Sequence, residues 1–428
     1  MRSRGVGLTL VTLAVLASSC ASPLVGGLAG HEDPHDPSGA GAGAGAGAQA
    51  SSCTQPGPGE SFRSAEPDAV DVRAAAVQDA VAYATARGAQ SVRVYRRDCL
   101  IGVSGWDPLT ESSTLPAWSM TKGVVSLGVG RAVTMGLMEV DAPIGTYLPA
   151  LSPAHAAITV RQLLNQTSGL RFAWANDLNL AGTGDSAGRT LTRPFEAVPG
   201  TTFIYAQTTI TALVSVVEAA VGEDFQSFIA REVFEPIGIT RNQWHWDRDP
   251  AGTTQGFAFL YMFPTAFGRI GSLLLDDGRW RGRELIAASY LRQGATGSSA
   301  NPGYGFLWRT NRTPPGATRA SEDPFREVMA SAPLDAFWFS GMFNQNVIMI
   351  PSLDIVVVRM GLPEELFADP LGNVASQRPD WDHRFFRMLL GGVTDVQVPD
   401  PGEWVPRPPS PPGPPAGLEP WHLIGIGF

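Results

Sequence analysis

Lysine and cysteine are both scarce in this sequence of 428 residues. Lys122 is the only lysine, so 30 of the 31 basic residues are arginine, and the chain has three cysteines. Acidic residues number 40, which gives a formal charge of −9 and a pI near 5.2. Phosphate binding needs a basic face, so this balance argues against nucleic acid as a partner. The hydrophobic fraction of 44% is typical of a globular protein with a sizeable core.

Metal-ligand and nucleotide-binding patterns are also missing. His31 and His35 lie in a segment of low complexity, and His245, between two tryptophans, has no partner at metal-ligand spacing. None of the six histidines lies in an obvious catalytic triad context, and no Walker or dinucleotide glycine pattern opens a helix. We therefore expect no metal and no cofactor.

The N-terminus has the features of an export signal. Arg2 and Arg4 precede an apolar run at residues 6–16, which is too short to span a bilayer, and small residues follow before Cys20. This order predicts a lipoprotein signal peptide at residues 1–20, with Cys20 as the lipid attachment site. The protein would then lie in the cell envelope, facing the periplasm or the outside, and would contact a membrane through its anchor only. The alternative is an ordinary secretory peptide, cut near Ala21, and a secreted protein.

Cys53 and Cys99 are the two cysteines that remain if Cys20 is lipidated. In an oxidising compartment such a pair can form a disulfide that persists. No spacing rule fixes a bridge between two cysteines, so two free thiols are the alternative.

Composition divides the mature chain into three parts. Residues 21–61 are dominated by glycine, alanine, proline and serine, which predicts a disordered tether. Residues 396–428 form a proline-rich tail. Between them, residues 62–395 are continuously patterned and predict one catalytic domain.

The pattern of that domain favours an α/β fold of the α+β type. Helical periodicity at residues 68–86 is followed by two strand-like runs, and further helical segments occupy the middle of the chain. The segments expected to be helical are 68–86, 120–135, 160–165, 208–221, 225–234 and 382–390, and the expected strands are 91–95, 100–104, 305–308, 336–339, 346–350 and 355–360. Strands at both ends that enclose helices predict an antiparallel sheet flanked by helices, with a mostly helical subdomain at about 119–250.

Ser119 and Lys122 are the strongest candidates for chemistry. On a helix that begins near Ser119 the two side chains share a face, one turn apart. Arginine cannot lose its proton, so a single lysine in an arginine-rich chain suggests a base. Burial and the helix N-terminus would lower its pKa and allow it to take the serine proton. The alternative, a solvated surface lysine, fits poorly with the apolar flanks Trp118 and 124–127.

Ser119-Met120-Thr121-Lys122 resembles the nucleophile motif of serine β-lactamases and penicillin-binding proteins. Residues 141–149, DAPIGTYLP, and 159–170, TVRQLLNQTSGL, are similar to the class C β-lactamase branch and its esterase relatives. The resemblance runs, with gaps, from about residue 91 to about residue 390. It implies the β-lactamase/DD-peptidase-like fold and an acyl-enzyme formed on Ser119 with Lys122 as the base.

The resemblance also implies a role for Tyr205. Residues 199–207, PGTTFIYAQ, match the family pattern Pro-Gly-x-x-x-x-Tyr-x-Asn except that Gln207 replaces asparagine. A tyrosine beside a lysine cation, partly present as phenolate, can carry a proton to the leaving group, which makes Tyr205 the expected proton carrier and Gln207 a substrate-binding candidate. Without the flanking match, core packing is the alternative for Tyr205.

The third family element is Lys or His, then Thr or Ser, then Gly, and the corresponding residues are Phe339-Ser340-Gly341. The cation is therefore missing. By the resemblance these three residues and Gln345 contact substrate, and the N–H groups of Ser119 and Met342 form the oxyanion hole. Members that lack the cation include esterases and aminohexanoate-dimer hydrolases.

These features predict a serine hydrolase of the carboxylesterase or amidase type that acts on a small ester or amide. The alternatives within the family are a β-lactamase or a D-Ala-D-Ala carboxypeptidase acting on cell-wall peptides. A non-catalytic envelope-binding lipoprotein is the alternative of another class.

Overall fold

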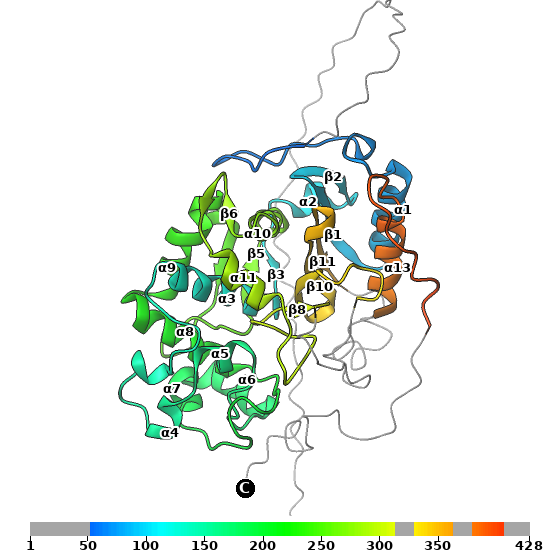
Figure 1. Cartoon of the computed structure of the whole chain (residues 1–428). Coiled ribbons are helices and arrows are strands. Elements are labelled where there is room, and N and C mark those ends of the chain that lie inside the picture. Colours follow the sequence, from blue (N-terminus) through cyan, green and yellow to red (C-terminus); the bar gives the residue numbers. More distant parts are fainter. Residues whose placement is uncertain (1–51, 313–328, 363–378, 406–428) are drawn as a thin grey trace, which may run out of the picture. The chain divides into compact units, whose positions relative to one another are not determined.

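The structure is a computed structural model and describes residues 52–312, 329–362 and 379–405 (Figure 1). All of these residues belong to one compact unit, Gln49–Phe428.

Among the described residues, six strands form one antiparallel sheet in the order β2, β1, β11, β10, β9, β8. The strands are β1 (Ala89–Arg96), β2 (Cys99–Val103), β8 (Arg309–Thr310), β9 (Phe337–Gly341), β10 (Gln345–Ile350) and β11 (Ile355–Gly361). Because β1 pairs with β11, strands from the two ends of the domain lie side by side. Adjacent residues of β10 face opposite layers: Val347 and Met349 belong to one hydrophobic core, and Ile348 and Ile350 to the other.

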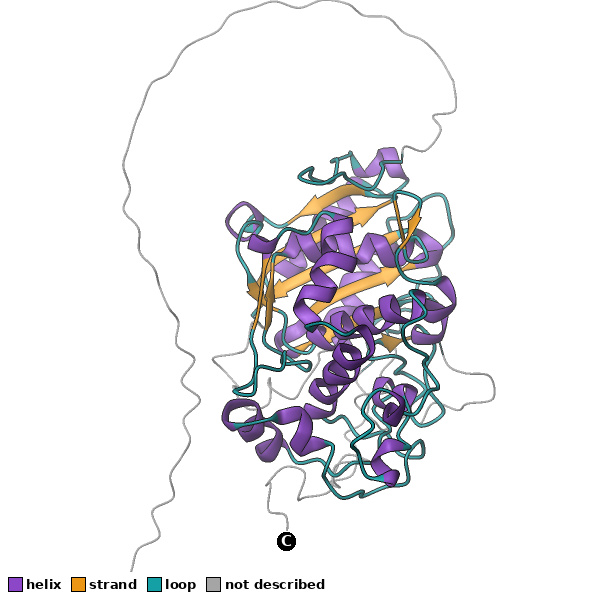
Figure 2. Ribbon diagram, turned by 90° about the vertical axis from the view of Figure 1, so that its left-hand side faces the viewer, coloured by secondary structure: helices purple, strands orange, loops and turns teal. Residues whose placement is uncertain are grey.

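Helices cover both faces of this sheet (Figure 2). Helices α1 (Ala74–Thr85) and α13 (Pro379–Leu390) pack together on one face. On the other face α10 (Pro264–Leu275) lies over β10 and β11, and α3 (Met120–Thr134) packs against β9. The predicted fold class, an antiparallel sheet flanked by helices, is confirmed.

The chain between β2 and β8 is mostly helical and carries two smaller sheets. Its further helices are α2 (Asp107–Thr110), α4 (Pro153–Ala156), α5 (Val160–Leu164), α6 (Trp174–Thr183), α7 (Ser186–Thr190), α8 (Thr208–Val221), α9 (Phe225–Ile229) and α11 (Ala288–Gly294). The small sheets pair β3 (Leu115–Pro116) and β4 (Trp244–Trp246) with β5 (Leu260–Met262), and β6 (Arg279–Trp280) with β7 (Arg283–Glu284).

Two predicted elements differ from the structure, and left-handed backbone explains both. The helix expected from residue 68 begins at Ala74, because Asp71, with φ 61°, separates a 3-10 turn from α1. The strand expected at residues 305–308 was wrong, and β8 begins at Arg309. Leu307 has a φ of 63°, which is incompatible with a strand.

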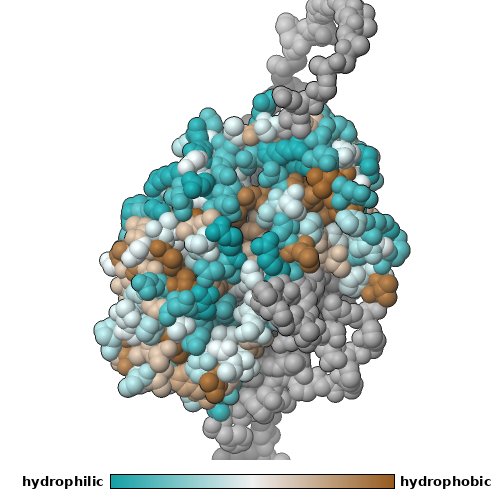
Figure 3. Space-filling view, in the orientation of Figure 1, coloured by the Kyte–Doolittle hydropathy of each residue, from teal (hydrophilic) through white to brown (hydrophobic). Residues whose placement is uncertain are grey.

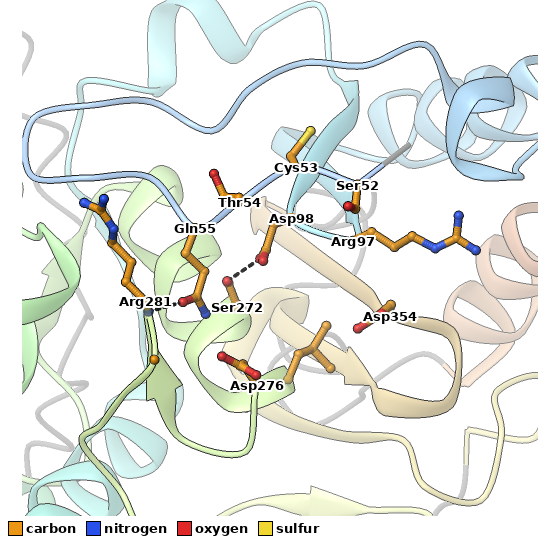
Figure 4. Close-up of a pocket in the computed structure, with 12 residues that line it drawn as sticks. Ser52, Cys53, Thr54, Gln55, Arg97, Asp98, Ser272, Asp276, Arg281 and Asp354 are labelled. Atoms are coloured by element: carbon orange, nitrogen blue, oxygen red, sulfur yellow. Dashed lines mark hydrogen bonds between the residues drawn. The ribbon is translucent and has the colours of Figure 1, made fainter. Parts of the chain in front are cut away.

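The ordered body begins before residue 61, the predicted end of the tether. A disulfide joins Cys53 to Cys99 at the start of β2, and the Cys53 N–H donates to the carbonyl of Arg97. Gln55 reaches the β6–β7 turn, where its Oε1 accepts from the N–H of Arg281 (2.5 Å) (Figure 4). The stretch before residue 61 contains enough polar and covalent contacts to pack against the body, although its composition resembles that of a linker.

The beginning of the proline-rich tail also packs, in this case against α13. Arg387 forms ion pairs with Asp400 and Glu403, and His383 lies 3.0 Å from the carbonyl of Gly402. Residues 406–428 of the predicted tail lie outside the described residues.

On the surface shown in Figure 3, hydrophilic and apolar residues are interspersed. No helix within the described ranges is long and apolar enough to cross a membrane. The same part of the chain holds no group of three or more His, Cys, Asp or Glu side chains arranged to bind a metal ion.

Candidate active site

Ser119 lies at the N-terminus of α3, directly after a strained residue. Trp118 has a left-handed φ of 47°, a conformation that costs a residue other than glycine about 1 to 2 kcal/mol. Ser119 stands at the N-cap position of α3 without a side-chain capping bond and is partly exposed, whereas the first turns of the helix after it are buried. The nucleophile candidate is thus accessible at the end of a buried helix.

Lys122 is buried and its amine has three close partners. Nζ lies 2.9 Å from Ser119 Oγ, 2.8 Å from Gln207 Oε1 and 2.9 Å from the carbonyl oxygen of Phe257. The Gln207 amide orientation is consistent with this, because its Nε2 donates to the Tyr205 carbonyl (3.2 Å). Two of the three partners are therefore oxygens that can only accept.

The burial of this amine favours its neutral form. Burial lowers the pKa of Lys122 well below its ordinary value, and the charge of Asp177 raises it in part. A neutral amine has two N–H groups, which satisfy the oxygens of Gln207 and Phe257. Its lone pair is then left for the third partner, the hydroxyl of Ser119. The arrangement can thus remove the serine proton.

Gln207 is held in place from two sides. Its backbone N–H donates to Asp177 Oδ2 (2.9 Å), as does that of Thr208 (2.8 Å) at the first turn of α8. Next to it, Gln166 makes two hydrogen bonds to the backbone of Ala206, of 3.1 and 3.2 Å. Gln207 was expected to contact substrate, but its carbonyl oxygen is occupied by Lys122 and its side chain is buried.

Tyr205 lies beside the Ser119–Lys122 pair. Its ring centroid is 4.8 Å from Lys122 Nζ, and its hydroxyl is hydrogen-bonded to Ser119. Burial raises the pKa of Tyr205, while the Ser119 bond and the charge of Arg309 lower it in part. Both shifts favour the uncharged forms of the two groups, whereas the sequence predicted a phenolate beside a lysine cation.

Gly341 brings β9 against the backbone of the nucleophile. A Cβ at this position would lie 2.4 Å from the carbonyl oxygen of Ala117 and 3.2 Å from the Ser119 nitrogen, so only glycine allows this approach. Met342 follows, partly exposed, in a turn where Phe343 has a φ of 61°. Met342, the expected second donor of the oxyanion hole, thus directly follows the residue that packs against the backbone of Ser119.

Phe339 was expected to contact substrate, but its side chain is buried in the core. Its side chain is 0% exposed, and its ring packs between Gly123 of α3 and Trp308, 5.7 Å between centroids. Because β-strand side chains alternate, the residue faces the α3 layer beneath the nucleophile, where it fills the core.

Gln345 was also expected to bind substrate, and the structure gives it another partner. Its Oε1 accepts from the N–H of Gly361 (2.8 Å), so the buried amide fastens β10 to the end of β11. Ser340 lies on the strand face opposite Phe339 and is partly exposed. Cys20 lies outside the described residues.

The sequence did not reveal Asp177, Gln166 or the Phe257 carbonyl as parts of the site. Gln166 belongs to the string TVRQLLNQTSGL, so that string could have signalled a structural role. Asp177 is an acidic residue in a helix far from Tyr205 in sequence, and a backbone carbonyl has no side-chain signature. Only the tertiary structure brings them together.

Comparison with known proteins agrees with this geometry. The sequence model described as Beta-lactamase matches residues 73–361, more than half of the chain. An esterase/β-lactamase of Mycobacterium tuberculosis is 29% identical over 167 residues, which are 37% of this chain and 37% of that protein. The match thus spans well under two thirds of that relative.

Solved structures share the fold at low sequence identity. A Bacillus anthracis protein assigned as a 6-aminohexanoate-dimer hydrolase superposes with a TM-score of 0.57 at 15% identity, covering 79% of this chain and 88% of that one. A family VIII carboxylesterase gives a TM-score of 0.54 at 14% identity, covering 74% and 96%.

Proposed function

This chain belongs to the β-lactamase family, and on that premise we propose that it is a serine hydrolase that forms an acyl-enzyme on Ser119. The observation that carries the proposal is the buried Lys122 amine, with two acceptor-only oxygens and the Ser119 hydroxyl as its partners. Lys122 takes the proton of Ser119 as its Oγ attacks the acyl carbon.

The proton then goes to the leaving group. Tyr205, neutral and bonded to Ser119, lies where it can pass a proton onward from the lysine ammonium to the departing alcohol or amine. The N–H groups of Ser119 and Met342 hold the oxyanion of the tetrahedral intermediate. Water completes the cycle by attacking the acyl-enzyme.

The substrates we propose are uncharged esters or amides with an apolar group. Phe339 leaves no cation at the third family position, so a carboxylate loses a contact worth roughly 1.5 to 3 kcal/mol. Since Phe339 is buried, the apolar surface beside Ser119 comes from Trp118 and Phe343 instead. Both are partly exposed, with their rings 5.3 Å apart in a T-shaped contact. The relative from Mycobacterium tuberculosis is named as an esterase as well as a β-lactamase, which supports the ester part of this proposal.

A hydrolysis screen tests the function. Wild type and Ser119→Ala are compared on short p-nitrophenyl esters, linear amides and a cephalosporin. We expect ester or amide turnover that the variant loses, and a lower kcat/KM on the cephalosporin. A cephalosporin preferred over every neutral substrate would identify a β-lactamase, and a wild type inert to all substrates and to a fluorophosphonate probe would identify a binding protein.

For location, we propose a lipid anchor on Cys20, supported by the signal-like residues before it. Expressed with its own signal in a bacterium, the protein should fractionate with membranes and become soluble as Cys20→Ser. The same distribution for both forms contradicts the anchor.

A further inference from the structure

Asp177 carries a buried charge that the proposed mechanism does not use directly. Its side chain is completely buried, and one oxygen forms an ion pair with Arg193. The other accepts from the N–H groups of Gln207 and Thr208, 2.9 and 2.8 Å away. An ionised carboxylate is costly to bury, and here every contact made by this second oxygen is to the start of α8.

The carboxylate caps α8 in place of the residue at the helix start. Gln207 stands at the N-cap, and its side chain makes no capping hydrogen bond. The first N–H groups of a helix lack partners within it and need an acceptor. Asp177, in α6, supplies that acceptor from another element. The Gln207 amide is therefore free to point at Lys122 Nζ.

We propose that Asp177 is a positioning residue of this hydrolase, which caps α8 from α6 so that Gln207 can hold the Lys122 amine against Ser119. A role in catalysis rests on the proposed function, but the contact of Asp177 with the start of α8 can be tested without measuring turnover. It assigns a role in catalysis to the helical region that contains α6 and α7.

The charge of Asp177 has a second consequence for the same amine. Burial is the main influence on the pKa of Lys122 and lowers it, and the Asp177 carboxylate acts in the opposite direction. Removing the carboxylate should lower this pKa further. Removing Arg193 leaves the carboxylate uncompensated, and the pKa of Lys122 should then rise.

Few other titratable groups surround the amine. Tyr205 lies beside it, and the charge of Arg309 in β8 acts on Tyr205. Two further titratable groups contact α3 beyond Lys122. Tyr290 of α11 is hydrogen-bonded to Ser126, and Glu232 forms an ion pair with Arg131 near the end of α3.

Lys122 is the only lysine of the chain, so its titration can be observed directly. The full chain is labelled with ¹³Cε-lysine, which gives a single Lys side-chain NMR signal. The titration midpoint is then measured for wild type, Asp177→Asn and Arg193→Gln. We expect a midpoint that is lower in Asp177→Asn and higher in Arg193→Gln than in wild type. The turnover number kcat should fall roughly 10- to 100-fold in Asp177→Asn, with a smaller change in KM, as expected for a misplaced base.

Asp107→Asn is the matched control. Asp107 is 3% exposed and pairs with the buried Arg93 of β1, three strands from β9, so its loss should destabilise the protein comparably. The Lys122 midpoint should not change in this variant. Equal midpoints in wild type and Asp177→Asn, or an equal shift in Asp107→Asn, overturn the inference.

Two outcomes separate the inference from the function. If Asp177→Asn does not fold, an unchanged midpoint in Arg193→Gln overturns the inference by itself. If wild type lacks turnover while the midpoints shift as expected, the proposed function fails and the Asp177 contact stands.

Discussion

At the scale of single residues, the protonation states of Lys122 and Tyr205 decide what the site can do. Burial acts on the two in opposite directions: it lowers the pKa of the amine and raises that of the phenol. Both directions favour the uncharged form, so we propose that Lys122 supplies the base and Tyr205 the acid beside Ser119. In enzymes, two neighbouring groups whose pKa values are shifted in opposite directions are candidates for the acid and the base.

Tyr205→Phe tests the acid. The variant keeps the ring, including its contact with Lys122, and loses only the hydroxyl. We expect kcat to fall roughly 10²- to 10⁴-fold, the usual contribution of a general acid, with KM nearly unchanged. A kcat within threefold of wild type, measured on an ester and on an amide, would rule out this role.

Among the secondary-structure elements, α3 packs closely against β9 directly behind Ser119. A Cβ on Gly123 would come within 2.4 Å of the Phe339 ring, so the helix can approach the strand only because this residue is glycine. The contact explains why the third family position is apolar here: a ring that fills the space under α3 replaces a cation that would need a partner.

Gly123→Ala should destabilise the protein by about 1 to 3 kcal/mol, because the methyl group overpacks the core. In an open helical site the same substitution stabilises by up to about 1 kcal/mol. Gly182→Ala in α6 is the matched control, since nothing lies within 4 Å of its Cβ position. Chemical denaturation measures both. Equal effects, or no recovery of Gly123→Ala by Phe339→Leu, would contradict this packing.

The turn between β1 and β2 holds a carboxylate that opposes folding at neutral pH. Asp98 lines a pocket with Asp276 and Asp354, and Ser272 donates to its Oδ1 (2.5 Å) (Figure 4). The pKa of Asp98 is raised to about 6, chiefly by burial and in part by the neighbouring Asp354 and Asp276, while the Ser272 bond acts in the opposite direction.

The pKa of Asp98 is higher in the folded protein than in the unfolded chain, so Asp98 binds a proton more tightly in the folded state. The protonated side chain therefore stabilises the fold at low pH, and this stabilisation is lost as the pH rises from about 4 to about 6. Asp98→Asn should remove this dependence and leave the variant about 1 to 2 kcal/mol more stable relative to wild type at pH 7 than at pH 4. Urea denaturation at the two pH values measures it. A stability difference that does not change with pH contradicts the shift.

Most elements of the sheet could be predicted because their signals are local. Strands β10 and β11 are apolar runs on either side of the turn at 351–354, and α8 has a helical period. What could not be predicted depends on distant contacts: β8 is set by the left-handed Leu307, and Asp177 reaches Gln207 only when α6 packs beside α8. Ser119 and Lys122 were predicted from the single lysine and its spacing to the serine, and Tyr205 from flanking residues that resemble a known family. The direction of their pKa shifts required the tertiary structure.

At the scale of the whole molecule, the N-terminal segment is joined to the sheet through Cys53–Cys99, which closes a loop with a sequence separation of 46. A cross-link of this span stabilises by roughly 2 to 4 kcal/mol, chiefly by restricting the unfolded chain. The link places the start of the ordered domain beside β2, and residues before 52 lie outside the described part.

Cys53→Ser with Cys99→Ser should therefore lower the free energy of unfolding by roughly 2 to 4 kcal/mol and leave kcat unchanged. Intact mass after alkylation without reductant gives the thiol count. Two alkylated thiols at Cys53 and Cys99 in wild-type protein expressed with its own signal-like N-terminus mean that the bridge does not form.

We propose that Lys122, as a neutral amine, activates Ser119. The most direct measurement is the rate at which a fluorophosphonate modifies Ser119 at pH 7.5 in wild type and in Lys122→Arg, with the adduct located by peptide mass. A guanidinium keeps a cation at the site but cannot accept the proton. We expect one adduct, on Ser119, and a rate at least about 10³-fold lower in the variant. A Lys122→Arg rate within tenfold of wild type, or an adduct on another residue, contradicts it.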